Sequence, residues 1–410
     1  MINSIEAQFS FSEKELKFLE TDFLGIKLIN PFVLASAPPT RDIHSLRKGF
    51  GAGWAGAVTK SVVSEPLVDK MPRIGHFRFQ DRITGSQNFE MGSEFGAEIW
   101  VNWLKSLALE FPDRLLIVSL FASSDPEEWK KLAGKFLNTG IHGFELNFSC
   151  PHSSHNLKGS VVGQNPGICA EITGAVREVC GSEFRIMPKL PYLVHPNEAE
   201  MCMQLTGAGM DCIAAINTVA GLCEFDIYTM QPKLNVNGKT TAGGVSYDMI
   251  RPFGRLIISN FARSIDWRRY PISAMGGVSR KIESMVEYFL LGANHLQVCS
   301  EVMNFGFNVV EEMKRNLVCY LNRTGKSLEE IRGCAVDNVV AWDELENDQR
   351  TSEISAHSCM KCYECVKGCM YEAIKHEKGR APFVIKEKCT GCGSCYAICR
   401  YGSVTMIQDK

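Results

Sequence analysis

The sequence predicts a (β/α)8 TIM barrel followed by a small α+β domain. Eight short, β-rich apolar runs alternate with longer amphipathic runs between residues 31 and 323, which is typical of a barrel built from strand–helix units. Two four-cysteine motifs follow between residues 359 and 399. The competing fold is a doubly wound open sheet, but the first strand is not followed by the glycine-rich loop of such sheets.

The expected strands and helices alternate in chain order. The strands are residues 31–36, 57–61, 115–121, 143–150, 185–190, 212–218, 271–278 and 295–300. The helices are residues 45–51, 94–111, 126–139, 166–180, 196–209, 247–265, 280–292 and 304–323. Many of these helices begin near Pro or Asp and end near Gly, as helix capping favours.

Two long segments interrupt the repeat, residues 62–93 and residues 219–246. Segments of this length usually act as lids or binding loops. Residues 51–56 match the dinucleotide-binding pattern GxGxxG, but such a loop must follow a strand and open a helix. Here the pattern ends a helix and opens a strand, so we interpret it as a helix stop with tight packing. No nicotinamide site is visible.

The 410 residues exceed the usual size of one domain. We expect a barrel over residues 1–323, a linker over 324–356 and a cluster domain over 357–410. The linker is expected because this stretch is polar and acidic, with one short helix near 327–332.

The two cysteine motifs share the spacing C-x2-C-x2-C-x3-C, which is the pattern of bacterial ferredoxins that hold two [4Fe–4S] clusters. In that pattern a tight loop supplies three thiolates and the other motif supplies the fourth. One cluster is therefore assigned to Cys359, Cys362, Cys365 and Cys399, and the second to Cys389, Cys392, Cys395 and Cys369. A zinc ribbon or a disulfide-rich tail is the alternative, but a ribbon uses paired CxxC units. The proline that usually follows the fourth cysteine is Met370 in one copy and Arg400 in the other.

Composition and charge exclude several classes of protein. The net charge of −2 gives no electrostatic basis for binding nucleic acid or an anionic membrane. The N-terminus does not resemble a signal peptide, and no run of about 18 apolar residues predicts a membrane span. Of the 17 cysteines, the nine outside the two motifs are scattered through apolar runs, as in reduced proteins. We therefore expect a cytoplasmic protein.

Polar residues gather where the expected strands end, which in a barrel is the active-site face. They are Ser36, Lys60, Asn147, Lys189, Asn217, Gly276, Gly277 and Ser300. Asparagine offers a donor and an acceptor to a flat amide-like ring, lysine stabilises a reduced anionic cofactor, and the Gly-Gly pair suits a phosphate. Taken singly, each is equally well a satisfied polar group at a strand end. Together they predict a flavin-type barrel connected to two iron–sulfur clusters.

Several stretches resemble the dihydropyrimidine dehydrogenase family, part of the dihydroorotate dehydrogenase superfamily. They are Asn-Pro-Phe-Val-Leu-Ala-Ser-Ala (30–37), Val-Thr-Lys (58–60), Glu-Leu-Asn-Phe-Ser-Cys-Pro-His (145–152), Val-Gly-Gln-Asn-Pro (162–166), Ile-Asn-Thr-Val-Ala-Gly-Leu (216–222), Thr-Thr-Ala-Gly-Gly-Val-Ser (240–246) and Leu-Gln-Val-Cys-Ser (296–300). The resemblance covers nearly the whole chain, and the bacterial two-subunit form is the closest in layout.

The resemblance implies a role for each matching residue. FMN would be held by Ala35, Ser36, Lys60, Asn147, Lys189, Asn217, Gly243, Gly244, Gly276, Gly277, Cys299 and Ser300. The substrate ring would be held by Asn88, Glu90, Asn147, Asn217 and Thr218. The catalytic residues would be Cys150 as the general acid, with Ser149 and His152 beside it.

The implied reaction reduces the C5=C6 bond of uracil or thymine, reversibly, with a hydride delivered from the flavin to C6 and a proton from Cys150 to C5. A thiol with an ordinary pKa of about 8.5 is protonated at neutral pH and can supply that proton. His152 is placed to tune the thiol or relay the proton.

Three departures from the family lie on the substrate side and leave other substrates open: the segment 153–159, Pro191 after Lys189-Leu, and Gly92. One alternative is the same flavin chemistry on dihydroorotate or another conjugated cyclic amide, although the carboxylate of Glu90 argues against dihydroorotate. The other is a non-enzymatic electron carrier, which would need neither Cys150 nor the three asparagines.

The chain has no expected FAD or nicotinamide domain. If NAD(P)H is the reductant, a separate flavoprotein subunit must pass its electrons to the clusters; otherwise a free ferredoxin supplies them. The cluster domain is then a docking surface as well as an electron path, and we expect an oligomer.

Overall fold

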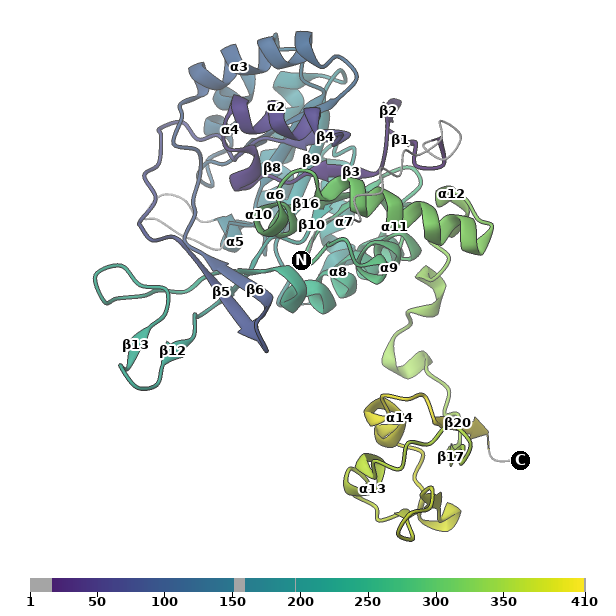
Figure 1. The fold of residues 1–410 in the computed structure, drawn as a ribbon. Helices are drawn as coiled ribbons and strands as arrows, with labels where there is room; N and C mark the ends of the chain where they lie inside the picture. The colour runs from purple at the N-terminus through teal and green to yellow at the C-terminus, as the bar shows by residue number, and fades with distance from the viewer. Residues whose placement is uncertain (1–16, 151–158, 196, 409–410) are drawn as a thin grey trace, which may run out of the picture. The chain divides into compact units, whose positions relative to one another are not determined.

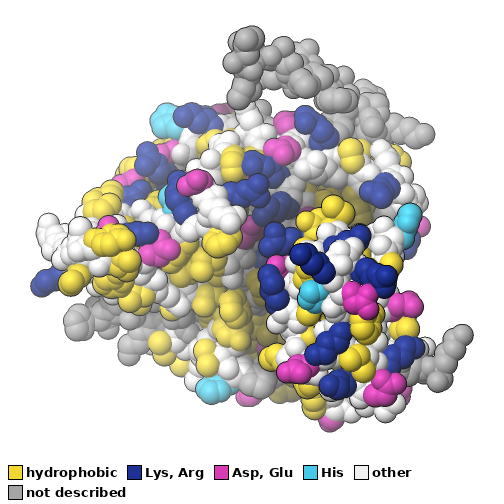
Figure 2. All heavy atoms as spheres, turned by 60° about the horizontal axis from the view of Figure 1, so that its bottom comes forward, with side chains coloured by type: hydrophobic (Ala, Val, Ile, Leu, Met, Phe, Trp, Pro, Cys, Tyr) yellow, Lys and Arg dark blue, Asp and Glu magenta, His cyan; other side chains and the backbone are white. Residues whose placement is uncertain are grey.

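The structure, a computed structural model, describes residues 17–150, 159–195 and 197–408. The chain forms two compact units that meet in sequence between Val339 and Val340. Figure 1 traces both units from the N-terminus to the C-terminus. Acidic and basic side chains are interspersed over the face shown in Figure 2, in keeping with the net charge of −2.

The first unit is the predicted barrel. Its strands close in the order β10-β15-β16-β3-β4-β7-β8-β9, and every neighbouring pair is parallel. The strands are β3 (Phe32–Leu34), β4 (Gly56–Val58), β7 (Leu115–Leu120), β8 (Gly143–Asn147), β9 (Arg185–Leu190), β10 (Ile213–Ala215), β15 (Ile272–Ala274) and β16 (Ala293–Val298). The predicted fold class is therefore confirmed. Seven of the strands end one to four residues earlier than expected, and β9 ends at Leu190 as expected.

The barrel has two apolar layers because its strands are buried on both faces. Strand β7 reads Leu-Leu-Ile-Val-Ser-Leu and all six residues are buried. Leu115 and Ile117 face an inner core with Val33 and Met187, whereas the alternate residues pack against the surrounding helices. The hairpin of β1 (Thr21–Phe23) and β2 (Ile26–Leu28) adds Phe23 and Leu28 to the inner core.

The helices begin and end where capping groups are available. Asp42 accepts a hydrogen bond from the N–H of Ser45, and Asn165 accepts one from Ile168. The helices around the barrel are α2 (Ile43–Gly51), α3 (Ala97–Glu110), α4 (Pro126–Gly134), α6 (Pro166–Cys180), α7 (Glu198–Gly207), α8 (Arg251–Ser264), α9 (Ile282–Leu290), α10 (Ser300–Phe305) and α11 (Val309–Thr324). The last expected helix is divided in two at Gly306, whose φ of +80° an α-helix cannot accommodate.

The GxGxxG pattern has the structural role expected for it. Helix α2 ends at Gly51, and Gly53 has a φ of +101°. Gly56 lies on β4, where a Cβ would come within 2.5 Å of Leu115 on the neighbouring strand. The pattern therefore ends a helix and allows two strands to approach closely.

The two segments that interrupt the repeat pair with each other. They form an antiparallel sheet in the order β11-β14-β6-β5, from β5 (Ile74–Phe79), β6 (Arg82–Asn88), β11 (Val219–Gly221) and β14 (Gly243–Ser246). Gln80 and Asp81 join β5 to β6 with φ values of +46° and +63°, as in a tight hairpin turn. Figure 1 shows β5 and β6 outside the ring of barrel strands. A second hairpin, β12 (Phe225–Asp226) and β13 (Gln231–Pro232), extends from the same region.

The second unit is small and contains two similar halves. Strand β17 (Arg350–Ile354) pairs with β20 (Val404–Gln408), and β18 (Ile374–Lys375) pairs with β19 (Phe383–Val384). Short helices α13 (Glu364–Lys367) and α14 (Ser394–Ile398) complete the halves.

The stretch expected as a linker, 324–356, is divided between the two units. Leu328, Ile331 and Val336 are buried in the core of the first unit, and β17 belongs to a sheet of the second. The polar composition of this stretch predicted a linker, although its few apolar residues pack in the barrel core. Within the described residues, no helix combines the length and apolarity needed to cross a membrane.

Candidate active site and cluster sites

A cavity lies at the end of the barrel where the parallel strands finish, and it encloses about 990 Å³ including its open mouth. Cofactor sites of TIM barrels occupy this end. The predicted site residues that line it are Ala35, Ser36, Lys60, Asn88, Glu90, Asn147, Cys150, Lys189, Asn217, Thr218, Gly276, Gly277, Cys299 and Ser300. Polar lining residues that were not predicted are Ser61, Ser86, Ser246, Tyr247 and Gln297.

Both lysines of the cavity are buried and paired with carboxylates. The Nζ of Lys60 lies 2.8 Å from Oε2 of Glu90, and the Nε of Arg73 lies 2.7 Å from Oε1 of the same carboxylate. The Nζ of Lys189 lies 3.3 Å from Oε1 of Glu145, which is fully buried. Glu90 is thus held between two cations. Arg73 was not predicted because the segment around it has no recognisable pattern.

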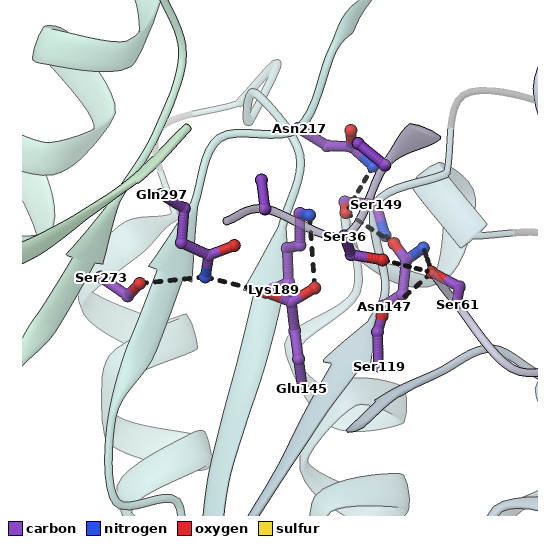
Figure 3. A network of polar contacts seen from close by, with 12 residues as sticks. Ser36, Ser61, Ser119, Glu145, Asn147, Ser149, Lys189, Asn217, Ser273 and Gln297 are labelled. Carbon is purple, nitrogen blue, oxygen red and sulfur yellow. Dashed lines mark hydrogen bonds and ion pairs between the residues drawn. The ribbon is translucent and has the colours of Figure 1, made fainter. Parts of the chain in front are cut away.

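A chain of hydroxyl and amide groups orients two of the asparagines (Figure 3). Asn147 donates from Nδ2 to Oγ of Ser61 at 2.9 Å, and its Oδ1 accepts from both the N–H and the hydroxyl of Ser149. The Oγ of Ser149 in turn accepts from Nδ2 of Asn217 at 3.0 Å. Ser149 is fully buried behind the cavity and does not line it. Ser149 was expected to be catalytic, and in the structure its hydroxyl is hydrogen-bonded to both amides.

Gly243 and Gly244 also lie behind the cavity rather than in its lining. A Cβ on Gly244 would come within 2.2 Å of Oγ1 of Thr218, and one on Gly243 within 2.6 Å of the carbonyl oxygen of Asn88. Asn88 donates from Nδ2 to the carbonyl of Gly244 at 3.0 Å. The two glycines therefore allow β14 to approach Asn88 and Thr218 closely. A cofactor contact was the role expected for them.

Gly276 and Gly277 do line the cavity, directly after β15. Their φ values are +110° and +76°, a region in which side chains other than that of glycine are strained. A Cβ on Gly277 would come within 2.7 Å of Cβ of Arg251. The turn therefore requires glycine and exposes backbone groups at the cavity wall.

Cys150 lies in the cavity wall beside Val63 and Phe121 and is 5% exposed. Gly159 packs on it so closely that a Cβ there would come within 2.8 Å of Cβ of Cys150. Burial raises the pKa of Cys299, a second thiol of the cavity, to about 12. His152 falls outside the described residues.

These residues fit a flat ring with polar edges and an attached phosphate. The wall offers lysine donors, oriented amides and the glycine turn after β15. It also offers the Oε1 of Gln297, which is buried without a hydrogen-bond partner among the described residues. A buried acceptor in this condition can take a hydrogen bond from a bound group or from an ordered water.

The second unit contains two cavities, each lined by four cysteines. One cavity is lined by Cys359, Cys362, Cys365 and Cys399, and the other by Cys369, Cys389, Cys392 and Cys395. Each set takes three cysteines from one motif and one from the other, as the spacing implied. Within the described residues, no group of three His, Cys, Asp or Glu side chains is arranged as the ligands of a single metal ion.

The two cysteine loops share a backbone conformation despite different sequences. Lys361 and Tyr363 have φ values of +56° and +58°, and Gly391 and Gly393, at the same offsets in the second copy, have +70° and +78°. The N–H of Lys361 lies 3.4 Å from the Sγ of Cys359. This loop geometry is the one by which a short segment directs several sulfurs at one group.

Comparison with known proteins matches each unit to a known family. A family model described as dihydroorotate dehydrogenase matches residues 18–321, and one described as a 4Fe-4S dicluster domain matches residues 358–404. The predicted 4Fe-4S domain is thereby confirmed.

Three relatives span most of the chain. The NAD-dependent dihydropyrimidine dehydrogenase subunit PreA of Escherichia coli K12 is 32% identical over 96% of both chains. The chloroplastic dihydropyrimidine dehydrogenase (NADP(+)) of Arabidopsis thaliana is 28% identical over 80% of this chain and 79% of its own. The catalytic subunit of dihydroorotate dehydrogenase B (NAD(+)) of Pyrococcus abyssi is 32% identical over 78% of this chain and 99% of its own. The chain therefore belongs to the dihydroorotate dehydrogenase family of oxidoreductases, and it resembles the dihydropyrimidine dehydrogenase subunit PreA along nearly its whole length, including the cluster domain.

Proposed function

We propose that the protein binds FMN and two [4Fe–4S] clusters and reduces the C5=C6 bond of uracil or thymine to the 5,6-dihydropyrimidine, reversibly. The observation that carries this proposal is the single cavity that brings a buried thiol, Cys150, together with oriented asparagines and two buried lysines. When bound, the flavin supplies the hydride that C6 receives.

The side chains of the cavity hold and orient the ring. The amides of Asn88, Asn147 and Asn217 are fixed by hydrogen bonds to neighbouring groups, so they present donors and acceptors to the ring edges without further ordering. Pre-orientation of this kind contributes to catalysis because less freedom is lost when the substrate binds. Glu90 accepts from a ring N–H, and its carboxylate is held in place by Lys60 and Arg73.

Cys150 holds the proton that C5 receives. The apolar neighbours Val63 and Phe121 exclude water from the thiol, and Gly159 keeps the chain close behind it. Ser149 acts through the two asparagines that it orients. We assign it as a positioning residue.

The cluster domain carries single electrons to and from the barrel, with its eight motif cysteines as ligands. The names of two relatives describe subunits that use NAD. We therefore propose that NAD(P)H acts only indirectly, through a partner flavoprotein subunit that passes its electrons to the clusters. The alternative electron donor is a free ferredoxin that docks on the cluster domain.

Dihydroorotate is a second candidate substrate, because two cations pair with the carboxylate of Glu90. The sequence argument against it was repulsion between Glu90 and the carboxylate of orotate. Since Lys60 and Arg73 both pair with Glu90, that repulsion is weaker than the sequence alone suggested.

Titration of the flavin absorption spectrum distinguishes the two substrates. We expect uracil and thymine to perturb the spectrum of the purified protein at lower concentrations than orotate, and uracil to be consumed when a low-potential electron donor is supplied. A spectrum that responds to orotate but not to uracil would transfer the proposal to the second candidate. A protein that responds to neither and consumes neither contradicts both.

The potential of one cluster depends on a serine of β17. The Oγ of Ser352 lies 3.6 Å from the Sγ of Cys389, and this serine is 2% exposed. A cluster-bound sulfur is a thiolate, so the hydroxyl is the donor, and such bonds raise the reduction potential. Ser352→Ala should therefore lower the midpoint potential of the cluster held by Cys389, as measured by redox titration followed by EPR.

Ser403→Ala is the matched control for that measurement. It removes a buried serine hydroxyl beside the other cluster but keeps the backbone N–H that lies 3.3 Å from the Sγ of Cys399. The Ser403 hydroxyl donates to the carbonyl oxygen of Ser358 at 2.7 Å, away from Cys389, so the midpoint potential of the cluster held by Cys389 should stay unchanged in this variant. An unchanged potential in Ser352→Ala would rule out the hydroxyl as a tuning group.

A further inference from the structure

Gln297 has one half of its side-chain amide bonded and the other half unpaired. It lies near the end of β16 and is 1% exposed. Its Nε2 donates to Oε2 of Glu145 and to Oγ of Ser273, both at 3.0 Å. Its Oε1 is buried, has no hydrogen-bond partner among the described residues, and belongs to a residue that lines the cavity. A buried acceptor in this state is costly unless a ligand satisfies it.

The orientation of this amide follows from a chain of neighbours with defined roles. Asn294 donates from Nδ2 to the carbonyl of Asp22, so its Oδ1, 3.2 Å from Nδ1 of His295, accepts from that nitrogen. Burial lowers the pKa of His295 to about 3, so the ring is neutral and its Nε2 is an acceptor. The hydroxyl of Ser273 therefore donates to Nε2 of His295 at 2.7 Å.

Because the Ser273 hydroxyl donates its hydrogen to His295, only its oxygen is available to Gln297, and that oxygen can only accept. Glu145, as a carboxylate, also only accepts. Both neighbours thus require the NH2 group of Gln297. A flipped amide would place Oε1 against a carboxylate oxygen, so Oε1 faces away from Glu145 and Ser273.

Lys189 completes the pattern because it shares Glu145 with Gln297. The Nζ of Lys189 lies 3.3 Å from Oε1 of Glu145, and Gln297 bonds Oε2 of the same carboxylate. Figure 3 shows the two side chains on either side of Glu145. The wall of the cavity therefore offers a cationic donor and a neutral acceptor near each other. A ring edge on which an N–H and a C=O are adjacent is complementary to this donor and acceptor, because the N–H can donate to Gln297 and the C=O can accept from Lys189.

The elements that carry these groups indicate which ring takes them. Glu145, Lys189 and Gln297 lie on the barrel strands β8, β9 and β16, whereas Asn88 lies on β6 of the added sheet. Lys189 is also one of the residues that the family resemblance assigns to the flavin, so a ring that contacts Lys189 and Gln297 together is the flavin.

We propose that Gln297 is a positioning residue for the flavin: its Oε1 accepts a hydrogen bond from the ring N–H of the bound cofactor, while Lys189 donates to an adjacent carbonyl. Oxidised flavin has one ring N–H, at N3, so this group is the donor. The inference rests on the proposed binding of FMN and adds the contact that selects its orientation.

The test compares FMN with 3-methyl-FMN, in which the N3 hydrogen is replaced. Dissociation constants are measured by quenching of flavin fluorescence with the full-length, flavin-depleted protein and its Gln297→Met variant, which has a side chain of similar length without an acceptor oxygen. We expect the unaltered protein to bind 3-methyl-FMN about tenfold more weakly than FMN, the size of one buried hydrogen bond. In Gln297→Met that ratio should fall to about threefold or less.

Ser273→Ala serves as the control because it removes one partner of Nε2 and leaves Oε1 in place. It should keep the full discrimination between the two flavins. Equal binding of both flavins by the unaltered protein overturns the assignment, whatever the variants do. A ratio that is unchanged in Gln297→Met also overturns it while leaving the proposed function standing. A protein that binds neither flavin overturns both.

Discussion

Replacing Cys150 by alanine should remove most of the turnover of uracil while leaving flavin binding unchanged. The thiol is buried in the cavity wall beside Val63 and Phe121, where water cannot readily replace it as a proton donor. Loss of a general acid typically slows a reaction by about 10²- to 10⁴-fold. Turnover is measured as consumption of uracil with a low-potential donor, and flavin binding by the absorption spectrum.

Cys169→Ala is the matched control for this experiment. Cys169 is a fully buried thiol of α6 whose Sγ contacts the carbonyl of Val162 and whose pKa is raised by burial. Its loss should cost packing energy but not turnover. Comparable activity in the two alanine variants would show that the proton reaches C5 by another route.

Replacing Glu90 by glutamine should lower both the affinity for uracil and the stability of the cavity. The carboxylate lies between Lys60 and Arg73, at 2.8 Å and 2.7 Å, and its side chain is only 6% exposed. Removing one partner of a buried charge pair typically costs about 3–5 kcal/mol, because the remaining charges are left uncompensated. Thermal unfolding should therefore begin at a lower temperature. The charge-assisted hydrogen bond to the ring N–H is also lost, at about 1.5–3 kcal/mol, so we expect the KM for uracil to rise by about tenfold to a hundredfold.

Asp69→Asn tests whether that effect belongs to Glu90 itself. Asp69 lies 3.7 Å from Arg73 and accepts from the N–H of Met91, but it does not line the cavity. This variant should change KM by less than Glu90→Gln does. Combining Glu90→Gln with Arg73→Met should recover part of the lost stability, because one unpaired cation is removed with the carboxylate. Equal KM values for the Glu90→Gln and Asp69→Asn variants would remove Glu90 from the substrate site.

Much of the candidate site follows from strand ends that the sequence marks. Lys60, Asn147, Lys189 and Asn217 each interrupt or follow an apolar run, and all four line the same cavity. Gln297 interrupts such a run as well, between Leu296 and Val298. A polar residue inside a buried strand could have marked Gln297 as a site residue. Its role, however, depends on hydrogen bonds to Glu145 and Ser273, which lie elsewhere in the sequence.

Other parts of the site had no signal in the strand pattern. Arg73 and Glu90 lie in a segment expected only as a lid or binding loop, and Glu90 was identified through the family resemblance alone. Strand β6 of that segment gains its position by pairing with β14, more than 150 residues later. Ser149 neighbours the predicted acid, yet its hydroxyl orients two asparagines. Sequence proximity to Cys150 could not reveal this, because successive residues after a strand can turn to opposite sides.

The sequence by itself determined the barrel, the cluster domain and the sharing of cysteines between the two motifs. Periodicity and motif spacing are local properties, and the parallel closure of β3 to β16 and the two four-cysteine cavities follow from them. Only the tertiary structure decided how the two interrupting segments form one sheet and which carboxylate holds each lysine. Pairings of that kind join residues distant in the chain, and their geometry is set by packing that no single stretch of sequence encodes.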